Sequence, residues 1–211
     1  MRAITACLLA ALLLAVAPQI AGAAKPRSAC QKLKQRGKDL APNAKLVVVV
    51  RGGDETGRIS GCLLPRGKVR TLASWDDGLS RASASLVRTA GRFAIVEESW
   101  GDQYGGTSRS LTRIDVQHGK RLSLSDYGCM LDYMTPGCTS GTSTGKLGMA
   151  STGAGAYELT DFATKTTTLQ AFSPSGTFTK LADGGVDALR VTSAGIAWTQ
   201  AGIQHTAPLP S

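Results

Sequence analysis

Short apolar runs separated by glycine-rich turns recur along the chain from residue 45 to its end. Residues 84–124 show this pattern most completely, with four runs that are each too short for a buried helix. Runs of four to eight residues with alternating or β-branched apolar positions predict strands. The segment therefore predicts one four-stranded antiparallel unit, with strands over residues 85–89, 92–97, 110–116 and 121–125.

The same pattern on either side of this segment predicts further strands. Residues 45–50 form a β-branched run typical of a strand that is buried on both faces. The other predicted strands cover residues 58–64, 69–73, 146–151, 155–160, 166–172, 177–181, 187–192, 195–200 and 203–208. Grouped by the intervening segments, the units hold three, four, four and three strands.

Two sequence signatures recur in the same order, which favours an imperfect repeat over chance similarity. In the first, a turn glycine is followed five residues later by a leucine, as in Gly67 to Leu72, Gly119 to Leu124 and Gly176 to Leu181. In the second, an alanine beside a large apolar residue follows a glycine turn, at Ala94, Ala156 and Ala197. Four-stranded repeat units of about 40–45 residues are typical of propeller blades.

On these residues the chain resembles secreted bacterial β-propeller-like repeat proteins over residues 45–209. The resemblance rests on Leu86 and the run Ala90-Gly-Arg-Phe-Ala-Ile95, then Gly119 to Leu124, and an echo from Leu189 to Trp198. It implies an all-β fold of about four antiparallel sheets of blade type, as a small ring or an open arc, and no specific function. The chain is too short for a six- or seven-bladed ring, and a two-sheet β-sandwich is the alternative fold.

The first 24 residues have the pattern of a secretory signal peptide. Arg2 supplies a positive start, residues 7–17 are an unbroken apolar run, and Ala21-Gly22-Ala23 is a small-residue cleavage pattern. No later segment approaches the length of a membrane span. We therefore expect an exported protein, either secreted or held at the cell envelope, with residues 25–44 as a basic N-terminal arm before a β-repeat domain over 45–211.

Four cysteines remain after removal of the signal peptide. An even number in an exported chain predicts disulfides, and three pairings are possible. We favour Cys30–Cys62 and Cys129–Cys138 because each pair is local in the sequence. The second bridge would then pin residues 126–145, in which no clear strand is visible, as an inserted surface loop. No C-x₂-C spacing occurs and the histidines stand apart, so we expect no metal site.

The charge and the motifs limit the functions that the sequence supports. The net charge of +9 is not accompanied by stacking aromatics, so an anionic cell-envelope polymer, a glycan or a protein is a better expected partner than nucleic acid. No G-x-S-x-G motif occurs. Glu97 and Glu98, being adjacent on a strand, point to opposite faces and cannot act as a catalytic pair. We expect no cofactor and identify no catalytic residue.

The long connection over residues 98–109 is the best candidate for binding, since function tends to concentrate in such loops. Its aromatic, amide and charged side chains suit contacts with a sugar or a peptide, and they are Trp100, Asp102, Gln103, Tyr104 and Arg109. The sequence thus favours a non-enzymatic, disulfide-stabilised β-repeat scaffold that acts as a binding or interaction module at the cell envelope. The alternative is an extracellular hydrolase acting on a carbohydrate or an ester.

Overall fold

The computed structural model describes residues 28–35, 38–40, 45–53, 56–76, 82–101, 107–132 and 135–211, with the backbone alone at 38–39 and 129–139. The elements are α1 (Ala29–Lys34), β1 (Lys38–Asp39), β2 (Leu46–Gly52), β3 (Thr56–Leu63), β4 (Arg70–Asp76), β5 (Ser83–Ala90), β6 (Phe93–Gly101), β7 (Thr107–Asp115), β8 (Lys120–Asp132), β9 (Thr135–Met149), β10 (Gly155–Asp161), β11 (Thr166–Phe172), β12 (Phe178–Asp183), β13 (Ala188–Thr192), β14 (Gly195–Gln200) and β15 (Ile203–Ala207). The all-β class expected from the sequence is confirmed.

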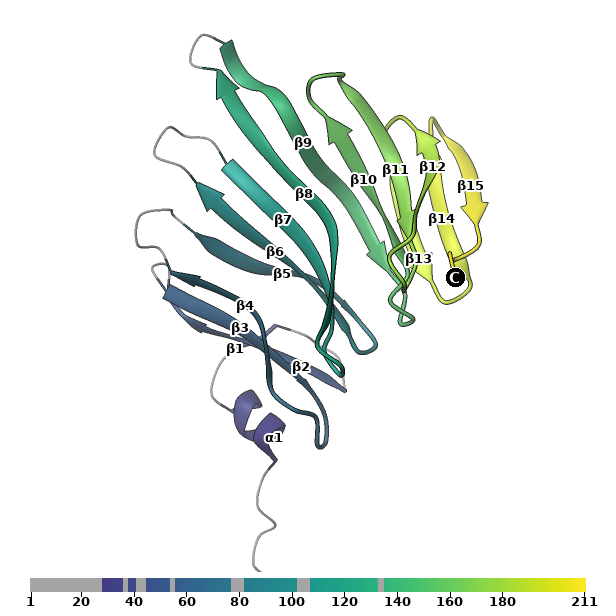
Figure 1. Ribbon diagram of the computed structural model, residues 1–211. Coiled ribbons are helices and arrows are strands. Elements are labelled where there is room, and N and C mark those ends of the chain that lie inside the picture. Colours follow the sequence, from purple (N-terminus) through teal and green to yellow (C-terminus); the bar gives the residue numbers. More distant parts are fainter. Residues whose placement is uncertain are drawn as a thin grey trace, which may run out of the picture.

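The strands form three antiparallel sheets in which neighbours in sequence are neighbours in space. The first sheet has the order β1-β2-β3-β4, the central sheet runs β12-β11-β10-β9-β8-β7-β6-β5, and the last sheet is β13-β14-β15. Every strand predicted from the sequence has a counterpart, from β2 for residues 45–50 to β15 for residues 203–208, whereas β1 was not predicted. The sheets follow one another in chain order from α1 to β15 (Figure 1).

The central sheet consists of two halves, β5–β8 and β9–β12, and among the described strands backbone pairing between the halves is confined to the β8–β9 hairpin. β8 pairs with β9 from Gly128 to Asp132, and β9 pairs with β10 from Thr142 to Met149. Away from the hairpin the two halves diverge, so their faces pack against each other as separate layers (Figure 1). The chain is thus a stack of four layers.

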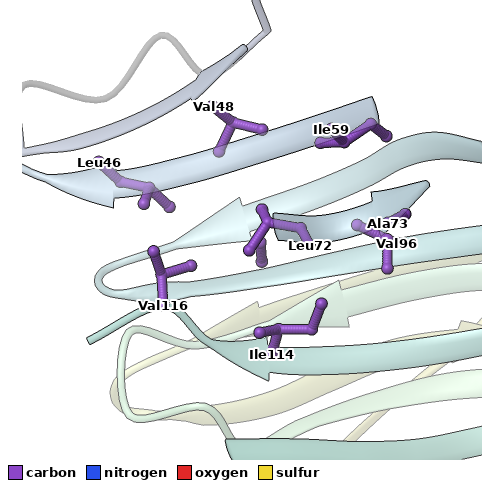
Figure 2. Packing of buried hydrophobic residues seen from close by; sticks show 9 residues of the cluster. Leu46, Val48, Ile59, Leu72, Ala73, Val96, Ile114 and Val116 are labelled. Carbon is purple, nitrogen blue, oxygen red and sulfur yellow. The ribbon is translucent and has the colours of Figure 1, made fainter. Parts of the chain in front are cut away.

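Alternating side chains bury both faces of the inner layers, because each layer packs against two neighbours. Between the first sheet and the β5–β8 half lies one apolar cluster, of Leu46, Val48, Ile59, Leu72 and Ala73 with Ala94, Val96, Ile114 and Val116 (Figure 2). Between the two halves lies a second, of Phe93, Ile95, Leu111, Leu124 and Tyr127 with Met149, Tyr157 and Phe172. Against the last sheet lies a third, of Ala150, Ala156, Leu169 and Ala171 with Val186, Val191, Ile196 and Trp198.

The helix α1 covers part of the outer face of the first sheet. Ser28 caps the helix by accepting from the Gln31 N–H, and Leu33 packs on Val47 and Val49. The predicted bridge Cys30–Cys62 is confirmed and ties the helix to β3. The other predicted bridge, Cys129–Cys138, falls on residues whose side chains lie outside the described part, and it stays a prediction.

Residues 126–145 differ from the strandless inserted loop that the sequence predicted. β8 runs on to Asp132 and β9 starts at Thr135, so the segment is a hairpin that extends the sheet. Residues 140–145, whose side chains the structure describes, are all serine, threonine or glycine, and none of them is buried. The alternating pattern that reveals half-buried strands is therefore missing, although the backbone pairs as a ladder.

No helix in the described ranges is long and apolar enough to cross a membrane.

Candidate functional site

The predicted binding connection is shorter than expected, because β6 continues to Gly101 and β7 starts at Thr107. Asp102, Gln103 and Tyr104 lie outside the described residues. Trp100 stands at the end of β6 with 41% of its surface exposed, rather than folded onto the sheet. Arg109 pairs with Ser99 across the ladder, so it points to the face opposite to Trp100.

The face that carries Trp100 presents two polar rows across the protruding ends of the strands. One row is Trp100 on β6, Ser108 on β7, Gly128 on β8 and Thr142 on β9. The next row toward the core is Glu98, Ser110 and Asp126. The exposed indole of Trp100 therefore shares this face with the hydroxyl groups of Ser108, Ser110 and Thr142 and with the carboxylates of Glu98 and Asp126. We call these seven residues the Trp100 face.

The opposite face of the same strand ends is occupied by internal contacts. The Tyr127 hydroxyl donates to Glu97, whose other oxygen lies 3.4 Å from Nη1 of Arg109. Burial raises the pKa of Tyr127, and the hydrogen bond to Glu97 raises it further. Arg109 is therefore engaged with Glu97, and through it with Tyr127. On the Trp100 face, Oε2 of Glu98 lies 3.4 Å from Nη2 of Arg121, while Trp100 is 41% exposed.

Arg113 is a buried guanidinium that links the two halves of the central sheet. From β7, its Nη1 donates to the Gly153 carbonyl at 2.6 Å and to the Ser173 carbonyl at 3.2 Å. Its Nη2 donates to the Pro174 carbonyl at 2.7 Å. The guanidinium carbon lies 5.3 Å from the centre of the Phe93 ring. Burial lowers the pKa of Arg113, while the charge of Asp115 opposes this shift.

Asp115, two residues further along, organises the β7–β8 turn. Its Oδ1 accepts from the backbone N–H of Gln117 and of His118, and its Oδ2 lies 2.9 Å from Nδ1 of His118. Arg92 Nε lies 3.1 Å from the same Oδ2. Burial alone would raise the pKa of Asp115, but the hydrogen bonds from His118 and the charges of Arg92 and His118 outweigh it and lower the pKa.

Glu158 performs a similar structural task between the later layers. Its Oε1 accepts from the Val186 N–H at 2.7 Å and its Oε2 from the Lys146 N–H at 2.8 Å. The second contact satisfies a donor at the irregular point of the β9–β10 ladder. A Cβ at Gly145 would lie only 2.6 Å from Oε2 of Glu158, so the glycine makes room for this carboxylate. Arg113, Asp115 and Glu158 thus hold layers and turns together.

A second open polar surface lies on the outer face of the first sheet, beyond α1. Arg51 on β2 pairs directly with Arg58 on β3, and Arg58 pairs with Ser74 on β4. Thr56 and Thr71 complete a hollow of about 490 Å³ whose floor includes the backbone of the β2–β3 hairpin. We call this hollow, lined by Arg51, Thr56, Arg58, Thr71 and Ser74, the arginine groove.

Sequence reasoning missed the arginine groove, although a signal for it was present. Arg51 and Arg58 flank a glycine-containing turn at equal distance from its middle, which is the arrangement of directly paired residues in a hairpin. Arg113 and Glu158 carried no such signal, because their burial depends on which layers stack. In the described part of the chain no group of three or more His, Cys, Asp or Glu residues is placed to hold a metal ion.

Comparisons of the chain with protein-family models, with curated proteins and with solved structures found no match.

Proposed function

We propose that this chain is an exported, disulfide-tied β-repeat module that binds a glycan at the cell envelope through the Trp100 face. The observation that carries the proposal is the half-exposed indole of Trp100 beside two rows of hydroxyl and carboxylate groups. Sugar rings offer apolar C–H faces that pack on an aromatic ring, and hydroxyls that bond to carboxylates and to serine or threonine side chains.

Two features support the remaining parts of the proposal. The Cys30–Cys62 bridge is of the kind that persists in an oxidising compartment outside the cytosol. The first strands of successive units, β5, β9 and β13, lie against one another, which is the arrangement of inner strands in propeller blades. We therefore assign the layers to a blade-type repeat in an open arc.

The test is binding of a panel of soluble cell-envelope oligosaccharides to the mature protein, measured by isothermal titration. Trp100→Ala should weaken binding of the best ligand at least tenfold, which corresponds to about 1.4 kcal/mol, while Trp100→Phe should retain part of it. Phe178→Ala is the matched control, because Phe178 is also a 41% exposed aromatic residue but lies on the distant strand β12. Equal affinity of Trp100→Ala and wild type for every ligand would contradict the proposal.

The same panel separates binding from the hydrolase alternative. Oligosaccharides and ester substrates incubated with the wild-type protein should be recovered intact by mass spectrometry. Turnover that disappears on Glu98→Gln, with binding retained, would favour the hydrolase instead.

A further inference from the structure

We propose that the arginine groove is a binding site for phosphate groups of an extended anionic polymer. It lies on the first sheet, away from the Trp100 face of the central sheet, and it extends the proposed function to a second ligand class. Within the groove, the cross-strand row of Arg51, Arg58 and Ser74 sets two guanidinium groups and a hydroxyl side by side.

The arrangement of the two arginines calls for an anion. Like charges directly opposite each other in an antiparallel ladder repel and destabilise the sheet. The Nε of Arg51 is buried and has no hydrogen-bond partner, and across the described residues Arg58 forms no ion pair. Asp76, the nearest carboxylate along β4, is already engaged by another group. A bound anion would accept hydrogen bonds from the guanidinium N–H groups that line the groove and would relieve the repulsion.

The donor set fits a phosphate group better than a carboxylate. Two guanidinium forks can each make paired hydrogen bonds, and Thr56, Thr71 and Ser74 add three hydroxyl groups around them. A tetrahedral phosphate directs acceptor oxygens to several sides at once, whereas a carboxylate has only two oxygens in one plane. The hollow of about 490 Å³ is large enough for more than one phosphate unit.

The surroundings favour a polymer in solution over a membrane surface. A protein surface that enters the headgroup region presents large apolar side chains beside its basic groups. The large exposed apolar side chains of the described chain are Val69, Val87, Trp100, Phe178 and Ile203, and none of them lines the groove. Trp75 does line it, but its ring packs against the first apolar cluster and its Nε1 donates to the Gly53 carbonyl. The positive net charge of +9 would draw a long polyanion to the protein.

The experiment measures binding of inorganic polyphosphate to the mature protein at several salt concentrations. The double variant Arg51→Gln/Arg58→Gln should bind at least tenfold more weakly. The slope of log affinity against log salt concentration should become shallower by about two, since each lost cation releases about one counterion fewer. The matched control is Lys120→Gln/Arg190→Gln, which loses the same charge on the exposed positions of other strands and should stay within twofold of wild type.

Three further arms decide the chemistry of the ligand. Poly-glutamate of equal charge should bind at least tenfold more weakly than polyphosphate; equal binding would overturn the assignment to phosphate. Vesicles containing phosphatidylglycerol should bind less than polyphosphate, and binding to vesicles alone would overturn the polymer. Equal loss of affinity in the groove and control variants would show a purely non-specific attraction and overturn the site.

Two controls test whether the groove variant folds normally and whether the Trp100 face acts independently of the groove. Circular dichroism and melting of the groove variant should match wild type, because Arg58 is exposed, Arg51 is partly exposed and neither belongs to an apolar cluster. Trp100→Ala should leave polyphosphate binding unchanged. If Trp100→Ala loses glycan binding and keeps polyphosphate binding, the two sites act independently, and each proposal can fail without the other.

Discussion

Replacing Arg113 tests whether one buried guanidinium holds the two halves of the central sheet together. In Arg113→Leu the buried carbonyls of Gly153 and Ser173 lose a charged donor, and the more exposed Pro174 carbonyl can turn to water. A buried acceptor left without its partner costs about 1–3 kcal/mol. Two such acceptors, less the gain from no longer burying a charge, lower the free energy of unfolding of Arg113→Leu by about 3 kcal/mol.

This loss is a large share of the stability of an ordinary domain, which is about 5–15 kcal/mol. With a urea dependence of about 2 kcal/mol per molar, the unfolding midpoint of Arg113→Leu should fall by about 1.5 M. Arg113→Lys should fall in between, because an ammonium group cannot reproduce the planar fork. Arg92→Gln is the matched control: Arg92, whose side chain is 44% exposed, pairs with the buried Asp115, and losing this ion pair should cost at most about 1 kcal/mol.

Hydrogen exchange tells where the loss arises. In Arg113→Leu the turns at residues 150–154 and 173–177 should lose protection first, while the first sheet keeps it. A midpoint shift below 0.5 M, equal to about 1 kcal/mol at this urea dependence, or a uniform loss of protection in all layers, would refute the reasoning.

Two further predictions concern the turn carboxylate and the disulfide. The pKa of Asp115 is lower in the folded chain than its ordinary value of about 3.9, so its stabilisation is complete above that pH and is lost as the pH falls through the lowered pKa. In urea unfolding, Asp115→Asn should therefore have a lower free energy of unfolding than the wild type near pH 7, and this difference should vanish in acid. Cys30→Ser/Cys62→Ser opens a loop with a sequence separation of 32 and should lower the free energy of unfolding by about 3–4 kcal/mol.

Each of these has its own contrary result. A deficit of Asp115→Asn that grows as the pH falls would mean that the carboxyl is more easily protonated in the folded chain. A double cysteine variant as stable as the oxidised wild type would mean that α1 is held by packing alone.

The prediction of β6 from the sequence succeeded because the packing of both its faces requires a local run of apolar residues. Phe93 and Ile95 face the β9–β12 half, and Ala94 and Val96 face the first sheet, so the run is apolar at every position. Such a run predicts a buried strand even when the layers on either side of it are not known. The same holds for the valines of β2 between α1 and the β5–β8 half.

The failures arise where a position depends on distant parts of the chain. Arg113 and Asp115 alternate with Ile114 and Val116, a pattern that predicts a solvent-facing position for Arg113. The stacking of β9–β12 on β5–β8 instead buries Arg113 against carbonyl groups of two distant turns. The connection expected over residues 98–109 contains Trp100, whose side chain is exposed at the end of β6. That Trp100 and Arg109 belong to opposite faces follows from the register of β6 on β7.

Hydrophobic periodicity, glycine turns and short cysteine spacing are properties of neighbouring residues, so most strands, the all-β class and the Cys30–Cys62 bridge could be predicted from the chain alone. The stacking of the faces, the pairing of residues 126–145 as a hairpin and the choice of charges that bind between layers appear only in the folded molecule. The fold also places Arg51 opposite Arg58 and leaves Trp100 exposed. These features depend on strand register and layer order, which result from the burial of the whole chain and are not encoded in any short segment.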